Sequence, residues 1–70
     1  MGVVVEVDGA RLRRRRRRRG LTMEELGKTA GVSLESIWRL ETGRTSARIT
    51  TVRKLAKALG VDAVDLLVMK

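Results

Sequence analysis

The sequence predicts an all-α fold, a compact bundle of five short helices that follows a short strand or extended arm. Thr22, Ser33 and Asp62 are residue types that cap helix starts, and each lies between two apolar residues spaced to pack across such a start. Between positions 49 and 59 the apolar residues recur at spacings of three and four, the period of one helical face. These observations predict helices near residues 10–19, 23–30, 34–42, 49–59 and 63–68.

Residues 1–8 form the predicted arm or strand. The segment Val3 to Val7 contains four β-branched valines, and the Asp8-Gly9 pair that follows favours a turn. A lone strand is not stable without a partner, so the segment pairs with its copy in a dimer, lies against the helices, or frays as a terminus. Residues 9–70 then form a single helical domain.

The first predicted helix carries seven consecutive arginines, Arg13–Arg19. Asp8 is suited to cap its start, Gly20 is suited to end it, and arginine has good helix propensity. On a helix these side chains point all round, so some stems cover apolar neighbours while their charged heads reach water. Two interpretations of this run stay open: a merely solvated face, and contacts to nucleic-acid phosphates.

The next two helices are short and closely joined. Thr22 and Glu25 have the spacing of a capping box, and Gly31 lies where a sharp helix exit needs a positive φ. Gly27 lies inside the first of the two helices, where glycine costs about 1 kcal/mol relative to alanine, so it indicates a close approach of the second helix. The segment Met23 to Thr42 therefore predicts a helix-turn-helix.

The helix predicted over residues 49–59 ends at Gly60, and its N-cap is open between Thr45, Ser46 and Thr50. The apolar pairs that flank the three caps are Leu21 with Leu26, Val32 with Ile37, and Val61 with Leu66. The predicted core consists of Leu12, Leu21, Leu26, Ala30, Val32, Ile37, Leu40, Ile49, Val52, Leu55, Leu59, Val61 and Leu66.

The charge balance points to a polyanionic partner. The chain has 70 residues, with 16 Lys and Arg against 8 Asp and Glu, which gives a net charge of +8 at pH 7. Such an excess on one small domain favours DNA, RNA or an anionic membrane surface.

Composition also excludes several classes of protein. Histidine and cysteine are absent, so the commonest general base and the commonest metal ligands are missing. We therefore expect no enzyme, no metal site, no cofactor and no small-molecule ligand. No apolar stretch is long enough to span a membrane, and the start of the chain lacks the basic region of a signal peptide. The expected location is the bacterial cytoplasm or nucleoid.

Four motifs follow one another along the chain: Gly20-Leu21-Thr22-x-Glu24-Glu25-Leu26, Ala30-Gly31-Val32-Ser33, Ile37-x-Arg39-Leu40-Glu41-x-Gly43-Arg44 and Leu55-Ala56-Lys57-Ala58-Leu59-Gly60-Val61. In this order and spacing they resemble the lambda repressor/Cro (Xre-type) helix-turn-helix regulators. The resemblance covers roughly Ala10 to Leu67 and makes residues 9–70 a helix-turn-helix DNA-binding domain. It implies a bundle of five helices, used as a symmetric dimer on a palindromic operator. Three positions depart from the family's pattern: Met23 stands where Gln is usual, Gly27 where Ala is usual, and Ala47-Arg48 where a Pro and a small cap residue are usual.

The resemblance implies that the second helix of the motif reads bases in the major groove. Its base-facing positions are Ser33, Leu34, Glu35, Ser36 and Arg39. Arg39 is suited to bind guanine O6 and N7 with two hydrogen bonds, and Glu35 either accepts from cytosine N4 or only complements the helix dipole. Leu34 either packs on a thymine methyl group or is a plain surface residue.

Other side chains are candidates for contacts to the DNA backbone, which provides much of the affinity. The candidates are Thr22, Lys28, Trp38, Arg44 and Arg48. In the family a basic residue just after the Glu-x-Gly turn meets the backbone, which points to Arg44. Trp38 has two compatible roles: packing over the end of the 49–59 helix, which its large apolar ring favours, and donation of its indole N–H to a phosphate.

Arg16 and Glu41 match an arginine and a glutamate that pair inside the family fold and tie the first helix to the end of the third. We therefore predict a structural ion pair between them. Removal of one partner of a buried pair costs about 3–5 kcal/mol, because the other charge stays buried alone.

The functional hypothesis is a sequence-specific transcriptional regulator that binds double-stranded DNA as a homodimer on a palindromic site. The alternative is a basic adaptor or antitoxin-like module that uses the same fold for a protein partner and binds nucleic acid without sequence preference. RNA binding through the arginine-rich helix and a membrane-surface role are weaker hypotheses, because the chain has one aromatic residue and the first helix little apolar surface. The dimer surface is either the Val3–Val7 arm or the last helix with Val64, Leu67, Val68 and Met69.

Overall fold

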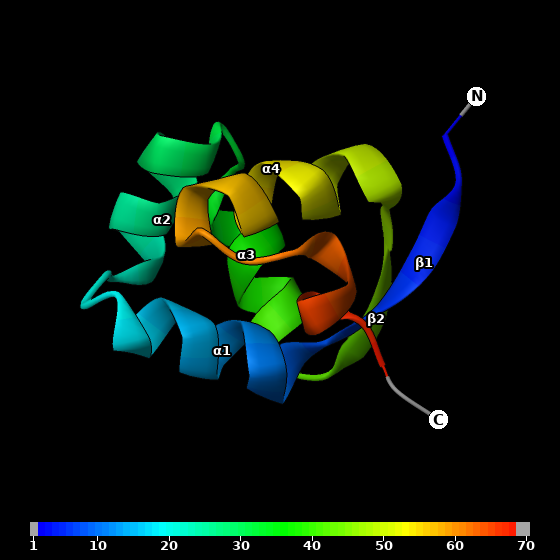
Figure 1. Ribbon diagram of the computed structural model, residues 1–70, viewed down its shortest axis with the longest axis horizontal. Coiled ribbons are helices and arrows are strands. Elements are labelled where there is room, and N and C mark those ends of the chain that lie inside the picture. The colour runs from blue at the N-terminus through cyan, green and yellow to red at the C-terminus, as the bar shows by residue number, and fades with distance from the viewer. Residues whose placement is uncertain (1, 69–70) are drawn as a thin grey trace.

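The computed structural model describes residues 2–68 of the chain (Figure 1). Over these residues it has four α-helices, one turn of 3₁₀ helix and a two-stranded antiparallel sheet. In chain order the elements are β1 (Val4–Asp8), α1 (Gly9–Arg18), α2 (Met23–Ala30), α3 (Leu34–Glu41), β2 (Arg44–Arg48), α4 (Ile49–Leu59) and η1 (Ala63–Leu66).

The prediction of an all-α bundle with five helices is wrong. The segment 63–68 forms only the single 3₁₀ turn η1, and Asp62 makes no capping hydrogen bond from its side chain. Leu67 instead forms an antiparallel bridge with Val7, and the Val68 N–H donates to the Glu6 carbonyl at 3.1 Å. Pairing with β1 thus takes the backbone groups that a longer helix would have needed.

The second error concerns β2, which the sequence did not predict. β1 and β2 pair antiparallel from Val4 opposite Arg48 to Asp8 opposite Arg44, and the Ile49 N–H donates to the Val3 carbonyl at 2.7 Å. The N-terminal segment is therefore a strand that pairs within its own chain. The residues of β2 are Arg, Thr, Ser, Ala and Arg, which lack the alternation of apolar and polar residues that predicts a strand.

The predicted N-cap of the 49–59 helix is also corrected. Arg48 occupies that position in an extended conformation, without a side-chain hydrogen bond to the helix. The start of α4 is set instead by the end of β2, because Arg48 is paired with Val4 immediately before the helix begins. Neither Thr45, Ser46 nor Thr50 is the cap.

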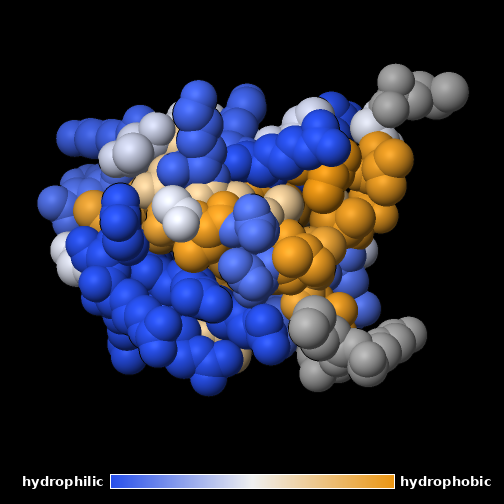
Figure 2. All heavy atoms as spheres, viewed as in Figure 1, coloured by the Kyte–Doolittle hydropathy of each residue, from blue (hydrophilic) through white to orange (hydrophobic). Residues whose placement is uncertain are grey.

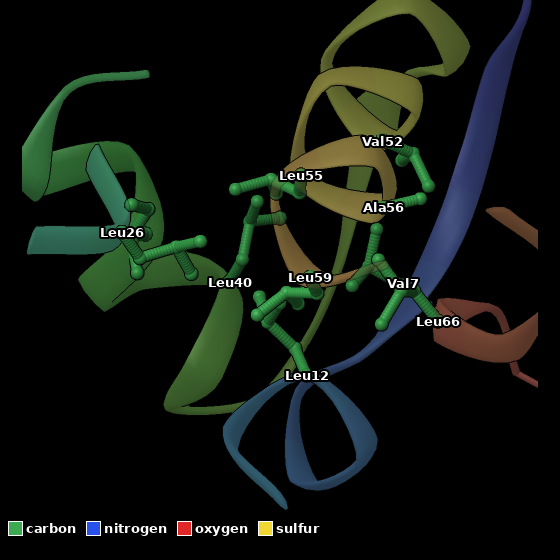
Figure 3. Packing of buried hydrophobic residues seen from close by; sticks show 10 residues of the cluster. Val7, Leu12, Leu26, Leu40, Val52, Leu55, Ala56, Leu59 and Leu66 are labelled. Carbon is green, nitrogen blue, oxygen red and sulfur yellow. The ribbon is translucent and has the colours of Figure 1, made fainter. Parts of the chain in front are cut away.

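Buried side chains from every element except β2 meet in one core (Figure 3). Eight predicted core residues are buried: Leu12, Leu26, Ile37, Leu40, Val52, Leu55, Leu59 and Leu66. The other five predicted residues are half-buried at the margin: Leu21, Ala30, Val32, Ile49 and Val61. The prediction missed Ala56 and Val7, and Val7 is only 1% exposed. Full burial of one such aliphatic side chain stabilises the fold by about 1.5–3 kcal/mol, so Val7 makes β1 a contributor to the core.

Within residues 2–68, the helices are all too short or too polar to cross a lipid bilayer.

Candidate nucleic-acid interface

The turn between α2 and α3 brings the two helices together through glycine. Gly31 ends α2 with φ of 71°, and the N–H groups of Gly31 and Val32 both donate to the Gly27 carbonyl, at 2.8 and 3.0 Å. A Cβ atom on Gly27 would lie 2.7 Å from the Val32 carbonyl oxygen. Contacts this short are essentially never found for Cβ atoms in proteins. The close approach predicted from Gly27 is therefore present, and it holds the start of α3 against α2.

The start of α2 is a complete capping box. Thr22 Oγ1 accepts from the Glu25 N–H at 3.0 Å, and Glu25 Oε1 accepts from the Thr22 N–H at 2.8 Å. These hydrogen bonds from Thr22 hold the pKa of Glu25 below its usual value. Thr22 is exposed, so the start of α2 is both fixed and open to solvent.

α3 has one buried face and one open face. Ile37, Leu40 and Glu41 are buried, and Glu35, Arg39 and Thr42 lie on the opposite side and are exposed. Leu34 is also exposed, at 49%. Ser33 and Ser36 are tied to each other, because Ser33 Oγ accepts from the Ser36 N–H at 3.2 Å and its hydroxyl lies 2.8 Å from Ser36 Oγ. Of the five predicted base-facing residues, Leu34, Glu35 and Arg39 thus have free exposed side chains, whereas Ser33 caps the helix.

Trp38 is 57% exposed on the same open side of α3. The sequence favoured packing of this ring over the end of α4. The ring is not buried in that way, because more than half of the residue is in solvent. Its ring lies largely in solvent, where the indole N–H is available to a partner.

A hollow beside α3 joins it to β2 and the start of α4. Ser36, Arg39 and Leu40 form its α3 wall, and the remaining lining residues are Thr45, Ser46, Ala47, Arg48 and Thr51. The structure therefore brings Arg39 and Arg48 to one surface. The sequence did not point to Thr45 and Ser46, because only the unpredicted strand β2 places them beside α3, nor to Thr51 in the first turn of α4.

The remaining predicted phosphate-contacting residues come from α2 and β2. Arg48 is exposed at the end of β2, and Lys28 is exposed in the last turn of α2. The backbone of Arg44 pairs with Asp8, but its side chain lies outside what the structure describes.

Arg16 and Glu41 form a buried ion pair between α1 and the end of α3. Arg16 Nε lies 2.6 Å from Glu41 Oε2, Arg16 Nη2 donates to Glu41 Oε1 at 2.9 Å, and Arg16 Nη1 donates to the Leu21 carbonyl at 2.7 Å. Both residues are less than a tenth exposed. The hydrogen bonds with Glu41 raise the pKa of Arg16 despite burial, so the guanidinium stays charged. The arginine run thus contributes one side chain to the interior.

Among residues 2–68, no group of three or more acidic side chains lies close enough together to hold a metal ion.

A family model and a curated relative match the chain to the helix-turn-helix family. A family model described as a helix-turn-helix domain matches residues 9–67. An uncharacterized HTH-type transcriptional regulator, y4dJ of Sinorhizobium fredii, is 41% identical over 58 residues, which are 83% of this chain and 75% of the relative. The restriction-modification controller protein C.AhdI of Aeromonas hydrophila has a similar structure, with a TM-score of 0.78 and 30% identity over 84% of this chain and 89% of its own. The biofilm regulator SinR, solved in complex with DNA, gives a TM-score of 0.77 and 26% identity over 80% of this chain and 90% of its own.

Proposed function

The chain belongs to the helix-turn-helix family of transcriptional regulators, and from this membership we propose that it is a sequence-specific regulator that binds double-stranded DNA. Members of this family are regulators rather than enzymes, so the prediction that the chain is not an enzyme is confirmed. The bacterial cytoplasm or nucleoid is the proposed location, since the proposed partner is duplex DNA.

The observation that carries the proposal is the open face of α3. A helix that enters the major groove must present polar and apolar side chains that no other part of the protein occupies. Leu34, Glu35 and Arg39 meet this condition, and the Ser33 cap fixes the helix start that presents them. Arg39 is the proposed guanine reader, Glu35 the proposed partner of a cytosine amino group, and Leu34 the proposed contact to a thymine methyl group.

Other residues of the domain are proposed to contact the DNA backbone. These are Thr22, Trp38, Arg44 and Arg48. Lys28 adds positive charge to the same domain. With a net charge of +8, the chain attracts duplex DNA at long range, and each neutralised phosphate adds to affinity by releasing counterions.

A homodimer on a palindromic site is the finer proposal. The two surfaces that the sequence offers for dimer contact lie side by side, because Leu67 bridges Val7 and Val68 pairs with Glu6. On this surface Val3, Val4 and Val64 are 64%, 61% and 55% exposed to solvent. Figure 2 shows this hydrophobic side of the molecule beside the charged one. Two copies of a strongly basic domain repel each other, so a contact through this apolar side is favoured. Met69 lies outside the described residues.

Selection from a library of random DNA duplexes tests the proposal. We expect enrichment of a palindromic site with half-sites about one helical turn apart. Arg39→Ala is expected to lose preference at one base pair of each half-site, at a cost of about 1–3 kcal/mol. The matched control is Arg19→Ala, because Arg19 lies beside Gly60, at the end of α4, and its loss removes the same charge. The control is expected to select the same sequence with weaker affinity.

Two other outcomes would count against the proposal. Tight, salt-dependent binding without an enriched sequence would favour the basic adaptor, in which the fold binds a protein partner. Enrichment of a single asymmetric half-site would support sequence-specific DNA binding but contradict the proposed homodimer.

A further inference from the structure

The arginine run of α1 is divided by the fold into sides with different surroundings. Arg16 faces the interior, whereas Arg13, Arg14, Arg17 and Arg18 are exposed and Arg15 is half-buried. All residues of the run are arginines, so any difference between their roles comes from their positions on the helix. Figure 2 shows the hydrophilic surface that these side chains spread over α1.

One side of the run adjoins the end of α3. Arg13, Arg14 and Arg17 line a hollow with Glu41, Thr42 and Gly43, the residues that end α3 and leave it. The first turn of α1 closes the other end of the hollow. Three guanidinium groups are thus placed next to the helix that is proposed to enter the major groove.

The two acidic residues of this hollow do not neutralise its arginines. Glu41 is paired with Arg16, and its carboxylate is 1% exposed. Asp8 Oδ1 caps α1 by accepting from the N–H groups of Ala10 and Arg11, at 3.1 and 3.2 Å. Both carboxylates already have partners, so the hollow presents positive charge and free donors to solvent.

The hollow is continuous with the open face of α3. Thr42 lies three residues after Arg39 and seven after Glu35, so the three share one side of the helix. The Thr42 N–H donates to the Trp38 carbonyl at 3.1 Å, which keeps Thr42 in register with that side. Because Thr42 also lines the hollow, Arg13 and Arg17 lie beside the C-terminal end of this open face.

The opposite side of the run has different neighbours. Arg15 and Arg18 line a second hollow together with Arg11 and Arg14, and all four belong to α1. Arg18 and Arg19 reach a third hollow with Leu21, Thr29 and Ala58, beside α2 and α4. Neither of these surfaces includes a residue of α3.

We propose that Arg13 and Arg17 form a phosphate-binding border that extends the α3 interface along the DNA backbone, with Arg14 at its margin. Arg15 and Arg18 lie away from α3 and hold no phosphate of the same duplex. Planar guanidinium groups bind phosphate oxygens through two parallel hydrogen bonds, and contacts of this kind add affinity without sequence preference. The inference rests on the proposed function, because it needs the duplex to lie on α3.

The test compares two charge-matched double variants, Arg13→Gln/Arg17→Gln and Arg15→Gln/Arg18→Gln. Each removes two positive charges from the same helix, and glutamine keeps good helix propensity. Circular dichroism checks that both variants fold. Affinity for the duplex enriched in the selection is then measured over a series of salt concentrations, and the slope of log affinity against log salt is compared with that of the unmodified chain.

We expect Arg13→Gln/Arg17→Gln to lower the slope by nearly two, because each phosphate contact contributes about 0.9. Arg15→Gln/Arg18→Gln is expected to change it by a small fraction of that amount. Equal changes in the two variants, or a larger change in the second, would overturn the border while leaving the regulator in place. Failure of the unmodified chain to bind or select duplex DNA would overturn both.

Discussion

The helix-turn-helix of residues 22–42 and the sheet of β1 and β2 are built by different kinds of contact. In the helix-turn-helix the partners are close in sequence: Thr22 with Glu25, Ser33 with Ser36, and Gly31 with Gly27. In the sheet they are far apart, from Val4 with Arg48 to Asp8 with Arg44. The helix-turn-helix is therefore shaped by local contacts, whereas the sheet forms only when segments far apart in the sequence meet.

The ion pair between Arg16 and Glu41 ties α1 to the end of the helix-turn-helix, and its loss gives the largest expected effect. Arg16→Ala leaves Glu41 buried without its partner, so the free energy of unfolding should fall by about 3–5 kcal/mol. Urea denaturation measures this loss. Arg17→Ala, one position along on the exposed side, is the control and should change stability by about 0.5 kcal/mol or less.

If Arg16→Ala does not fold at all, the double variant Arg16→Met/Glu41→Leu tests the same interaction. Replacement of both charges by apolar residues of similar size should restore a folded domain. A single variant as stable as its control would show that the pair does not couple α1 to α3.

The contribution of the sheet is tested at Val7, the residue of β1 that enters the core. Val7→Ala removes two buried methyl groups and leaves a cavity, so it should lower the free energy of unfolding by about 2–3 kcal/mol. Val4→Ala on the same strand is the control, because Val4 is 61% exposed. Equal losses in the two variants would contradict a core role for β1. Both are measured by thermal and urea unfolding.

The local packing of the helix-turn-helix is tested at Gly27. In Gly27→Ala the new methyl group meets the Val32 carbonyl, and relief of this overlap should cost about 2 kcal/mol. Gly43→Ala is the control, since nothing lies within 4 Å of a Cβ there. If Gly27→Ala unfolds no more easily than Gly43→Ala, the turn can shift without loss, and the local region is less tightly fixed than the sheet.

The smallest expected effect concerns the capping box and pH. The folded pKa of Glu25 is lowered by its hydrogen bonds with Thr22. Its charged form therefore stabilises the fold at pH values above its usual value of 4.5, and this contribution is lost as the pH falls through the lower folded value. Glu25→Gln keeps the box geometry but does not titrate, so its stability should decline less steeply below pH 4.5. Parallel declines in the two proteins, measured by urea unfolding from pH 6 to about pH 3, would contradict the cap as a source of pH dependence.

The same contrast explains how much the sequence could predict. Starts of α2 and α3 follow from Thr22 and Ser33, because each cap acts on atoms within its own turn. Buried positions of α4 follow from the spacing of Val52, Leu55 and Leu59. Neither β2 nor the shortened last helix could be predicted, because both depend on pairing with β1, and their own residues carry no apolar alternation or effective cap.

The candidate site divides in a similar way. Arg39 and Glu35 could be assigned to the open face of α3 from the family resemblance, because it identifies the helix and their positions on it. Trp38 could not, because the position of its ring depends on whether any neighbouring element is near enough to cover it. Arg13 and Arg17 could not be separated from Arg15 and Arg18, since seven identical residues give no information about which side of α1 faces α3.

The run of arginines also affects how susceptible the chain is to proteolysis. An enzyme that cuts after arginine finds its densest set of sites at Arg13–Arg19, most of them within the hydrogen-bonded backbone of α1. Cleavage of a helix requires it to open first, so the rate follows the free energy of opening. Arg16 ties α1 to Glu41 and to the Leu21 carbonyl, and opening the helix means breaking these bonds. The segment with the most cleavage sites is thus protected by one of its own arginines. Resistance of the chain to such a protease therefore depends on the stability of the fold.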